Sequence, residues 1–384
     1  MSHATSSHVA IVGAAESPYT RHPAVGTTTA GVLGDAVVRA LRDAGLQPGD
    51  VDGLGVASFT LGPDHAIDLA WRLGLHLRWV MQDTNGGASA GGMLQHAVRA
   101  VEAGDASVVV LVAGDAMDHA AHIRLVKSYN QATVDHLADL PMTGPNALFA
   151  MLTQRQMAAW QLDRTDYGHL VVAQRAWAGL NPGAVYRAPM TLDEYLDAPL
   201  VATPLGRLDC VPPVTGADAI IVTSEERATG RRARVLAVTT AYNVDDQAGD
   251  GIQTAVASCA PAAWERAGVA PTDAEVISVY DDYPAMVLSQ LVDLGVAGAE
   301  SIKALIAQQI ATRRLPVNTS GGQLSAGQAG AGGGMHGMVE VVQQLRGRAS
   351  DRQVEARIGV VTGYGMVLYR HGSCGNVAVL EAVA

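Results

Sequence analysis

The sequence has 384 residues and a formal net charge of -11, with 48% hydrophobic and 16% charged residues. Because a single hydrophobic core stops growing at roughly 250 to 300 residues, this length predicts two core-bearing units. The acidic balance argues against a nucleic-acid ligand, which needs clustered Lys and Arg, and the low share of charged residues favours a subunit interface.

The three cysteines, Cys210, Cys259 and Cys374, lie far apart, with no CxxC pair. This pattern is against a cysteine zinc site and a disulfide framework, and it favours a cytoplasmic protein without a metal. The first eight residues do not resemble a signal peptide, and no run of about 18 apolar residues predicts a membrane span.

In chain order, apolar runs at 8–13, 107–113 and 359–362 predict buried strands, and Ala-rich periodic segments between them predict helices. The alternation is typical of an α/β protein. An internal repeat supports two similar halves: 44–56 (AGLQPGDVDGLGV) and 267–279 (AGVAPTDAEVISV) share a helix end, a proline turn and a strand.

A second repeated feature is the tripeptide GGM, which opens a helix at 91–93 and again at 333–335. Such small residues let a helix N-terminus approach a neighbour or a ligand closely. The segment from about 117 to 201 has no counterpart in the other half and carries turn signals, so it is interpreted as an inserted loop domain. The predicted division is an N-terminal half at 1–116, the loop domain at 117–201, a return strand and linker at 202–230, and a C-terminal half at 231–384.

Four segments in order resemble the thiolase superfamily, particularly the sterol-carrier-protein-type thiolases and their bacterial thiolase-like relatives. They are 181–196 (NPGAVYRAPMTLDEYL), 204–210 (PLGRLDC), 318–322 (NTSGG) and 328–334. The resemblance implies two βαβαβ-type halves in a five-layered αβαβα arrangement with an inserted loop domain. It further implies an acyl-CoA thioester as substrate, no covalently bound cofactor and a homodimer. Asn318 and Gly322 are expected to line the substrate site.

The resemblance also implies a nucleophilic Cys at the start of a buried helix, where the helix dipole lowers the thiol pKa. The matching segment is 85–89 (NGGAS), and it places Gly87 at that position, so the usual acyl-enzyme is not expected. Ser89 is the nearest hydroxyl. Without a His base beside it, Ser89 is interpreted as a helix-start or packing residue at the substrate site rather than a nucleophile.

A second functional position is 280–283 (YDDY), where the sterol-carrier type has His-Asp-Cys-Phe. Tyr280 replaces the His and could donate a hydrogen bond or carry a proton, and Asp282 could act as a base. The alternative is that Tyr280 fills a strand end while Asp281 caps the next helix.

The other two positions also differ from the family. Gln328 stands where Gly-His-Pro has its His, and an amide can polarise a carbonyl but cannot shuttle a proton. Nearby His336 is either a base or a buried packing residue. Tyr364 and Cys374 both lie near the family's late Cys, so either could face the pocket.

These features favour an enzyme that breaks or forms a carbon–carbon bond next to a CoA thioester, as thiolase-like aldolases do. In this hypothesis Tyr280 and Tyr364 carry protons and Gln328 polarises the carbonyl. The resemblance implies a small companion protein with an OB fold and often a zinc ribbon. One departure is that those aldolases carry a tyrosine just before the His-Gly matching 336–337, where this chain has Gly334-Met335. The alternatives are acyl transfer by Cys374 and a degenerate thiolase that binds acyl-CoA or scaffolds a partner.

Overall fold

The computed structural model describes residues 8–128, 144–244, 251–368 and 371–384, together with positions 131, 135, 137 and 139. Nine strands form one sheet in the order β3-β2-β4-β7-β1-β8-β11-β10-β9. The sheet divides into two similar halves that meet where β1 pairs with β8, at Ala10 opposite Arg234 and Ile11 opposite Ala233. The predicted α/β class is therefore confirmed.

The N-terminal half alternates strands and helices. Its elements are β1 (Val9–Glu16), α1 (Thr29–Ala44), β2 (Gly53–Ala57), α2 (His65–Leu73), β3 (Trp79–Asp83), α3 (Ser89–Ala103), β4 (Val108–Asp115) and β7 (Gly216–Ser224). The C-terminal half contains β8 (Arg232–Ala241), α9 (Val256–Ala267), β9 (Val276–Ser278), α10 (Pro284–Asp293), α11 (Ile302–Leu305), α12 (Gly322–Ala326), α13 (Gly333–Leu345), β10 (Ile358–Leu368) and β11 (His371–Val383).

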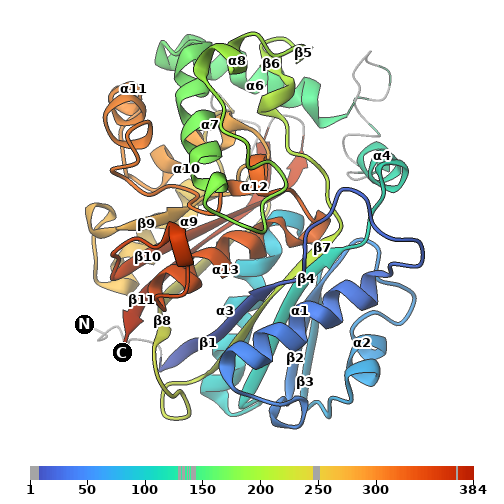
Figure 1. Cartoon of the computed structure of the whole chain (residues 1–384). Helices are drawn as coiled ribbons and strands as arrows, with labels where there is room; N and C mark the ends of the chain where they lie inside the picture. Colours follow the sequence, from blue (N-terminus) through green and yellow to red (C-terminus); the bar gives the residue numbers. More distant parts are fainter. Residues whose placement is uncertain are drawn as a thin grey trace.

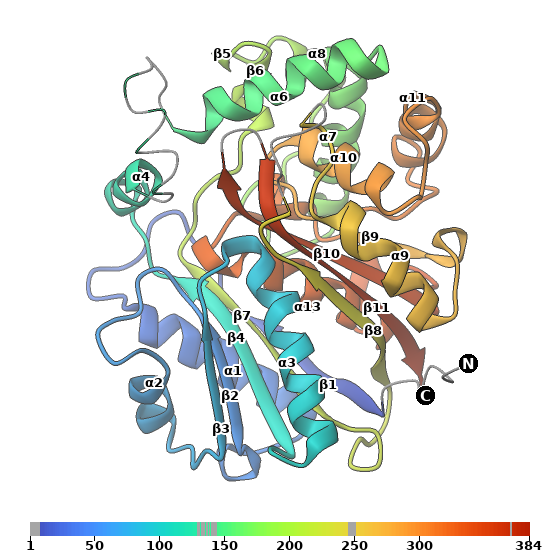
Figure 2. The same cartoon turned by 180° about the vertical axis from the view of Figure 1, so that it is seen from behind.

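Helices α3 and α13 form the middle of five layers (Figures 1 and 2). They contact each other and strands of both half-sheets, and their apolar faces form one core that draws on both halves. Helix α1 covers the outer face of the N-terminal half-sheet, and α9 covers that of the C-terminal half-sheet. This arrangement is the predicted αβαβα fold.

The internal repeat is reproduced in detail. Helices α1 and α9 end at the left-handed glycines Gly45 and Gly268, with φ of 70° and 68°. Each is followed by a proline-initiated 3₁₀ turn, Pro48–Asp50 or Pro271–Asp273, and then by a strand. Glycine supplies this conformation without the steric cost of a Cβ, which explains why the repeat is visible in the sequence. Helix α3 begins at Ser89, two residues before the predicted Gly91.

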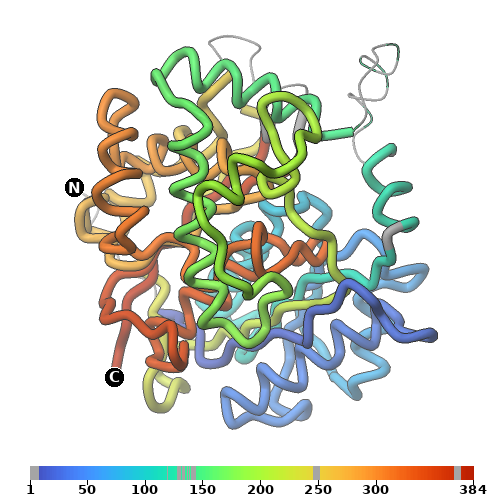
Figure 3. Tube along the Cα trace, turned by 45° about the horizontal axis from the view of Figure 1, so that its top comes forward, coloured from blue at the N-terminus to red at the C-terminus, as the bar shows by residue number. Residues whose placement is uncertain are grey.

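A helical region lies above the sheet in the view of Figure 1 and comes forward in the tilted view of Figure 3. It comprises α4 (His119–Ser128), α6 (Pro145–Trp160), α7 (Arg164–Gly179), α8 (Leu192–Leu196), β5 (Leu200–Ala202) and β6 (Leu205–Gly206). Helices α6 and α7 pack on α10, so this region rests on the C-terminal half. The four-part domain division stays a prediction. None of the described helices is long and apolar enough to cross a membrane.

A buried ion pair anchors α13. Glu340 accepts from Arg352 Nη2 at 2.8 Å and from Thr319 Oγ1 at 2.7 Å, and both charged side chains are at most 8% exposed. Removing one partner of such a pair leaves the other charge buried without compensation.

We expect Arg352→Met to lower the free energy of unfolding by about 3–5 kcal/mol in urea titrations. The control is Arg72→Met, which removes a solvent-exposed pair with Asp68 on α2 and should leave the midpoint unchanged. Equal midpoints for the two variants would contradict the anchoring role of Arg352.

Candidate active site

The candidate site forms where four segments meet: the end of β9, the start of α13, the end of β10 and the 3₁₀ turn Gly86–Ala88 before α3. The ring of Tyr280 lies directly over Gly87. A Cβ at Gly87 would stand 2.1 Å from Tyr280 Cε2 and 2.4 Å from the Tyr364 carbonyl oxygen. Any side chain at position 87 would therefore displace the tyrosine, so the ring occupies the space that a nucleophilic Cys would need.

The Tyr280 hydroxyl belongs to a polar network. It donates to Asp282 Oδ2 at 3.1 Å, and Gln328 Nε2 lies 3.0 Å from the Tyr280 oxygen. Gln328 Nε2 also lies 2.8 and 2.9 Å from the two carboxyl oxygens of Asp282. The amide nitrogen of Gln328 is thus directed at Asp282 and Tyr280, whereas the sequence predicted that it would polarise the substrate carbonyl.

Asp282 is poised to exchange protons near neutral pH. Burial raises the pKa of its carboxyl to about 7, although the hydrogen bonds from Tyr280 and Gln328 oppose that shift. A carboxyl that titrates near 7 can take a proton from a bound phenol or hydroxyl and return it. The predicted assignment of Asp282 as a base is compatible with this environment.

The neighbouring Asp281 has a structural role that corrects one sequence interpretation. Its Oδ1 accepts from the backbone N–H of Gln323 at 2.9 Å, so it caps α12, not the adjacent α10. It is fully enclosed, because a Cβ on Gly322 would lie 2.0 Å from its Oδ2. Sequence reasoning missed this contact because Asp281 and Gln323 are 42 residues apart.

The strand register separates Tyr364 from Cys374. In the antiparallel pair β10–β11, Tyr364 lies opposite Gly375, and Gly365 lies opposite Cys374. Directly opposite residues share a face of the sheet, so the two side chains point to opposite faces. Tyr364 stacks with Tyr280 at 6.2 Å between ring centroids and an angle of 9°. Burial raises the pKa of the Cys374 thiol, which disfavours a thiolate.

His336 is on α13 at the wall of the site, but its ring nitrogens are occupied. Nδ1 lies 2.9 Å from Glu16 Oε1, and Nε2 lies 2.7 Å from Ser320 Oγ. Burial alone would lower the pKa of His336, but the charges of Glu16 and Asp218 outweigh it and raise the pKa to about 9. At neutral pH His336 is therefore a buried cation and not a free base.

The same cluster contains the described residues best placed to hold a metal. Glu16, Asp218 and His336 offer ligand atoms within 4.8 Å of one another. Tyr19 donates to Asp218 Oδ2 at 2.6 Å. The protonated imidazole already pairs with Glu16, and this phenol already donates to Asp218. The predicted absence of a metal stays a prediction.

The remaining predicted residues hold the backbone of the site. Asn318 Oδ1 accepts from the N–H of Val279 at 2.9 Å and fixes the end of β9. Ser89 is fully buried and donates to Asp83 Oδ1 at 2.6 Å, as a helix-start residue would. Gly322 adopts φ of 60° beside Asp281. These contacts give Ser89 and Asn318 positioning roles and leave their assignment to substrate binding a prediction.

Two residues that sequence reasoning missed complete the site. Asn376 Nδ2 donates to the Ala88 carbonyl at 2.7 Å and holds the 3₁₀ turn that carries Gly87. Phe149 on α6 stacks on Tyr283 at 4.4 Å and lies 6.4 Å from Tyr364. Neither has a local sequence signal, because each acts through a partner far away in the chain.

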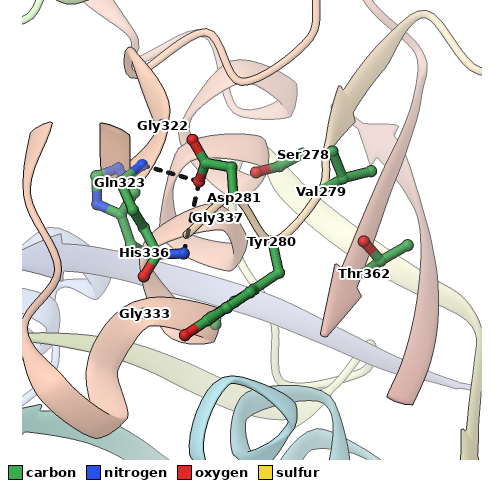
Figure 4. Close-up of a pocket in the computed structure, with 11 residues that line it drawn as sticks. Ser278, Val279, Tyr280, Asp281, Gly322, Gln323, Gly333, His336, Gly337 and Thr362 are labelled. Atoms are coloured by element: carbon green, nitrogen blue, oxygen red, sulfur yellow. Dashed lines mark hydrogen bonds between the residues drawn. The ribbon is translucent and has the colours of Figure 1, made fainter. Parts of the chain in front are cut away.

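A small cavity of about 10 Å³ lies in the middle of this arrangement (Figure 4). Its wall includes Tyr280, Asp281, Gln323, Gly333 and His336. This volume is room for about one water molecule.

Comparison with known proteins agrees with this geometry. Residues 237–377 match a family model described as thiolase C-terminal domain-like. A 17-hydroxy-3-oxo-4-pregnene-20-carboxyl-CoA lyase of Mycobacterium tuberculosis is 33% identical over 366 residues, which cover 89% of this chain and 92% of that protein. The chain belongs to the thiolase superfamily.

Further relatives place it among the thiolase-like aldolases within that superfamily. A steroid side-chain-cleaving aldolase of Thermomonospora curvata is 30% identical, with 85% of this chain and 88% of that protein covered. The solved structure of an Ltp2-ChsH2(DUF35) aldolase is 26% identical, covers 98% of both chains and superposes with a TM-score of 0.86. The predicted resemblance and thiolase fold are confirmed.

The carboxyl pKa values of this thiolase-like protein predict an unusual pH dependence of stability. Because the pKa of Asp282 is raised to about 7 from 3.8, the folded state binds more protons than the unfolded state between these values. The contribution of Asp282 to stability is therefore present at low pH and is lost as pH rises from about 4 to 7.

We expect Asp282→Asn to remove this loss, so that the variant gains stability relative to the wild type by about 1 kcal/mol or more between pH 4 and 7. Urea titrations at several pH values measure the difference, and Asp193→Asn on exposed α8 is the control. Parallel curves for wild type and Asp282→Asn would contradict the raised pKa.

Proposed function

We propose that this protein is an acyl-CoA aldolase that cleaves the carbon–carbon bond between Cα and a hydroxyl-bearing Cβ of a CoA thioester. The observation that carries the proposal is the Tyr280 ring over Gly87, with its hydroxyl joined to Asp282 and Gln328. This arrangement replaces a covalent nucleophile by a phenol and a carboxyl group that titrates near neutrality. Two relatives are named as a CoA lyase and a steroid side-chain-cleaving aldolase, and these names support the same reaction class.

In the proposed reaction, Tyr280 accepts the proton of the substrate hydroxyl as its own proton passes to Asp282. The hydroxyl carbon becomes a carbonyl as the Cα–Cβ bond breaks, and the electron pair of that bond forms the thioester enolate. Backbone N–H groups at the glycine-rich start of α13 stabilise the enolate oxygen. Tyr364 protonates Cα and is reprotonated from Asp282 through solvent, so the site ends with the protons it began with.

Gln328 has a supporting role in this proposal. Its amide nitrogen holds the carboxyl group of Asp282 and the oxygen of Tyr280 at 2.8–3.0 Å. The bond from Gln328 to the Tyr280 oxygen keeps the phenol beside the carboxyl group of Asp282. Acyl transfer through Cys374 gains no support, since burial raises the pKa of its thiol and disfavours the thiolate.

The first test is turnover of 17-hydroxy-3-oxo-4-pregnene-20-carboxyl-CoA by the full chain and two tyrosine variants. We expect Tyr280→Phe to lower kcat by roughly 10²- to 10⁴-fold, the usual contribution of a general acid–base group.

Activity should rise with pH through about 7, because the base form of Asp282 is required, and Asp282→Asn should abolish that rise. Tyr242→Phe, at an exposed tyrosine, is the control. Unchanged kcat in Tyr280→Phe, or a covalent acyl adduct on Cys374, would refute the mechanism.

We further propose that the protein is a cytoplasmic homodimer and works with a companion of the DUF35 type, the class of protein named in the similar Ltp2-ChsH2(DUF35) aldolase structure. We propose that this companion is the small protein with an OB fold and often a zinc ribbon that the resemblance to thiolase-like aldolases implies. The homodimer is supported by the exposed edge strand β3 with Val80 and by the exposed Ile67 and Trp71 on α2.

Light scattering during size-exclusion chromatography should give twice the chain mass of 39.8 kDa, and more after co-expression with a DUF35 protein. We expect Val80→Asp to shift the chain towards a monomer, because it places a charge in an apolar contact. The exposed Val25, outside β3, provides the control Val25→Asp. A monomeric wild type would refute the dimer.

A further inference from the structure

The side chain of Gln323 has a fixed orientation in the small cavity. It is 1% exposed, and its backbone N–H donates to Asp281 Oδ1 at 2.9 Å. Its Nε2 lies 3.5 Å from that same oxygen. Turning the amide over would place Oε1 against a carboxyl oxygen, so the nitrogen end is held towards Asp281. Figure 4 shows the amide between Asp281 and the start of α13.

The oxygen end of this amide points into the cavity. A Cβ on Gly333 would lie 2.1 Å from Gln323 Oε1 and 3.0 Å from Tyr280 Cε2, so the acceptor and the tyrosine ring approach the same glycine. Within the described residues, Oε1 has no hydrogen-bond partner. A buried acceptor without a hydrogen-bond partner destabilises the folded state. The cavity therefore favours binding of a small group that donates a hydrogen bond to Oε1.

A hydroxyl group is of the right size and chemistry. The cavity of about 10 Å³ holds about one water, and a substrate hydroxyl can replace a water at an acceptor without loss of the hydrogen bond. A carbonyl or a hydrogen at the same substrate carbon cannot donate, and binding it would leave Oε1 unpaired.

We propose that Gln323 Oε1 accepts a hydrogen bond from the substrate hydroxyl when the thioester binds, before the O–H turns to Tyr280 for proton transfer, and so selects hydroxyacyl-CoA over deoxyacyl-CoA thioesters. This inference rests on the proposed function, because it names the group by which the same site recognises its substrate. Gln323 is then a specificity-determining residue that contacts substrate, and the absence of a side chain at Gly333 leaves room for Oε1 in this position.

The test compares binding of 17-hydroxy-3-oxo-4-pregnene-20-carboxyl-CoA and its 17-deoxy analogue to the full chain by calorimetry, with the Tyr280→Phe substitution present in every sample so that the hydroxy compound is bound and not cleaved. The variant Gln323→Met keeps the length of the side chain and removes the acceptor, and Gln323→Leu serves if the Met variant does not fold. Gln174→Met is the matched control, since Gln174 donates to Asp281 Oδ2 at 2.6 Å but does not line the cavity.

We expect the Tyr280→Phe parent and its Gln174→Met variant to bind the hydroxy compound roughly 10-fold or more tightly than the deoxy compound. The Gln323 variants should bind the two compounds within about 2-fold of each other, mainly through weaker binding of the hydroxy compound. A preference retained in the Gln323 variants, or lost equally in Gln174→Met, would overturn the inference.

The two proposals fail in different ways. Cleavage by the wild type, with equal binding of both compounds by the Tyr280→Phe parent, would overturn the role of Gln323 and leave the aldolase proposal standing. A parent that does not bind the hydroxy compound, with a wild type that does not cleave it, would overturn both.

Discussion

The packing of the Tyr280 ring on Gly87 is the contact on which the rest of the site depends. It leaves no room for a side chain at position 87, and it sets the phenol beside Asp282 and Gln328. The backbone around Gly87 is equally crowded, because Cβ atoms on Gly334 or Gly363 would lie 2.1 or 2.8 Å from its carbonyl oxygen. Glycines on three elements thus bring backbone and ring together, as close packing requires.

The electrostatic environment determines which groups near this contact can exchange protons at neutral pH. Burial raises the pKa of the Asp282 carboxyl to about 7, so the carboxyl group titrates where a histidine normally would. In His336, carboxyl neighbours overcome burial and raise the pKa to about 9, so the imidazole stays charged. The environment, and not the residue type, decides which group exchanges protons.

The helical region above the sheet contributes to the site through aromatic contacts. Phe149 stacks on Tyr283, whose hydroxyl donates to Asn146 Oδ1 at 2.6 Å at the start of α6. Phe149 also reaches Tyr364, so α6 closes over the two tyrosines proposed to carry protons. Helix α6, which lies between the two halves of the repeat in the sequence, thereby contacts a site built by both halves.

The sequence alone determined the α/β class and the duplicated halves, and its resemblance to thiolases predicted the loss of the nucleophile at Gly87. These features are local: periodic apolar runs, a proline turn after a left-handed glycine, and a Gly at one motif position each leave a signal in a few adjacent residues. The choice between Tyr364 and Cys374 stayed open, since the face of a side chain depends on strand register.

Only the tertiary structure decided that Tyr280 occupies the space at Gly87, that Asp281 caps α12 and that Gln323 directs an acceptor into the cavity. These contacts join residues about 40 to 200 positions apart, and no pattern within either segment specifies its distant partner. The shifted pKa values of Asp282 and His336 also depend on the tertiary structure, because burial and neighbouring charge are properties of the folded chain.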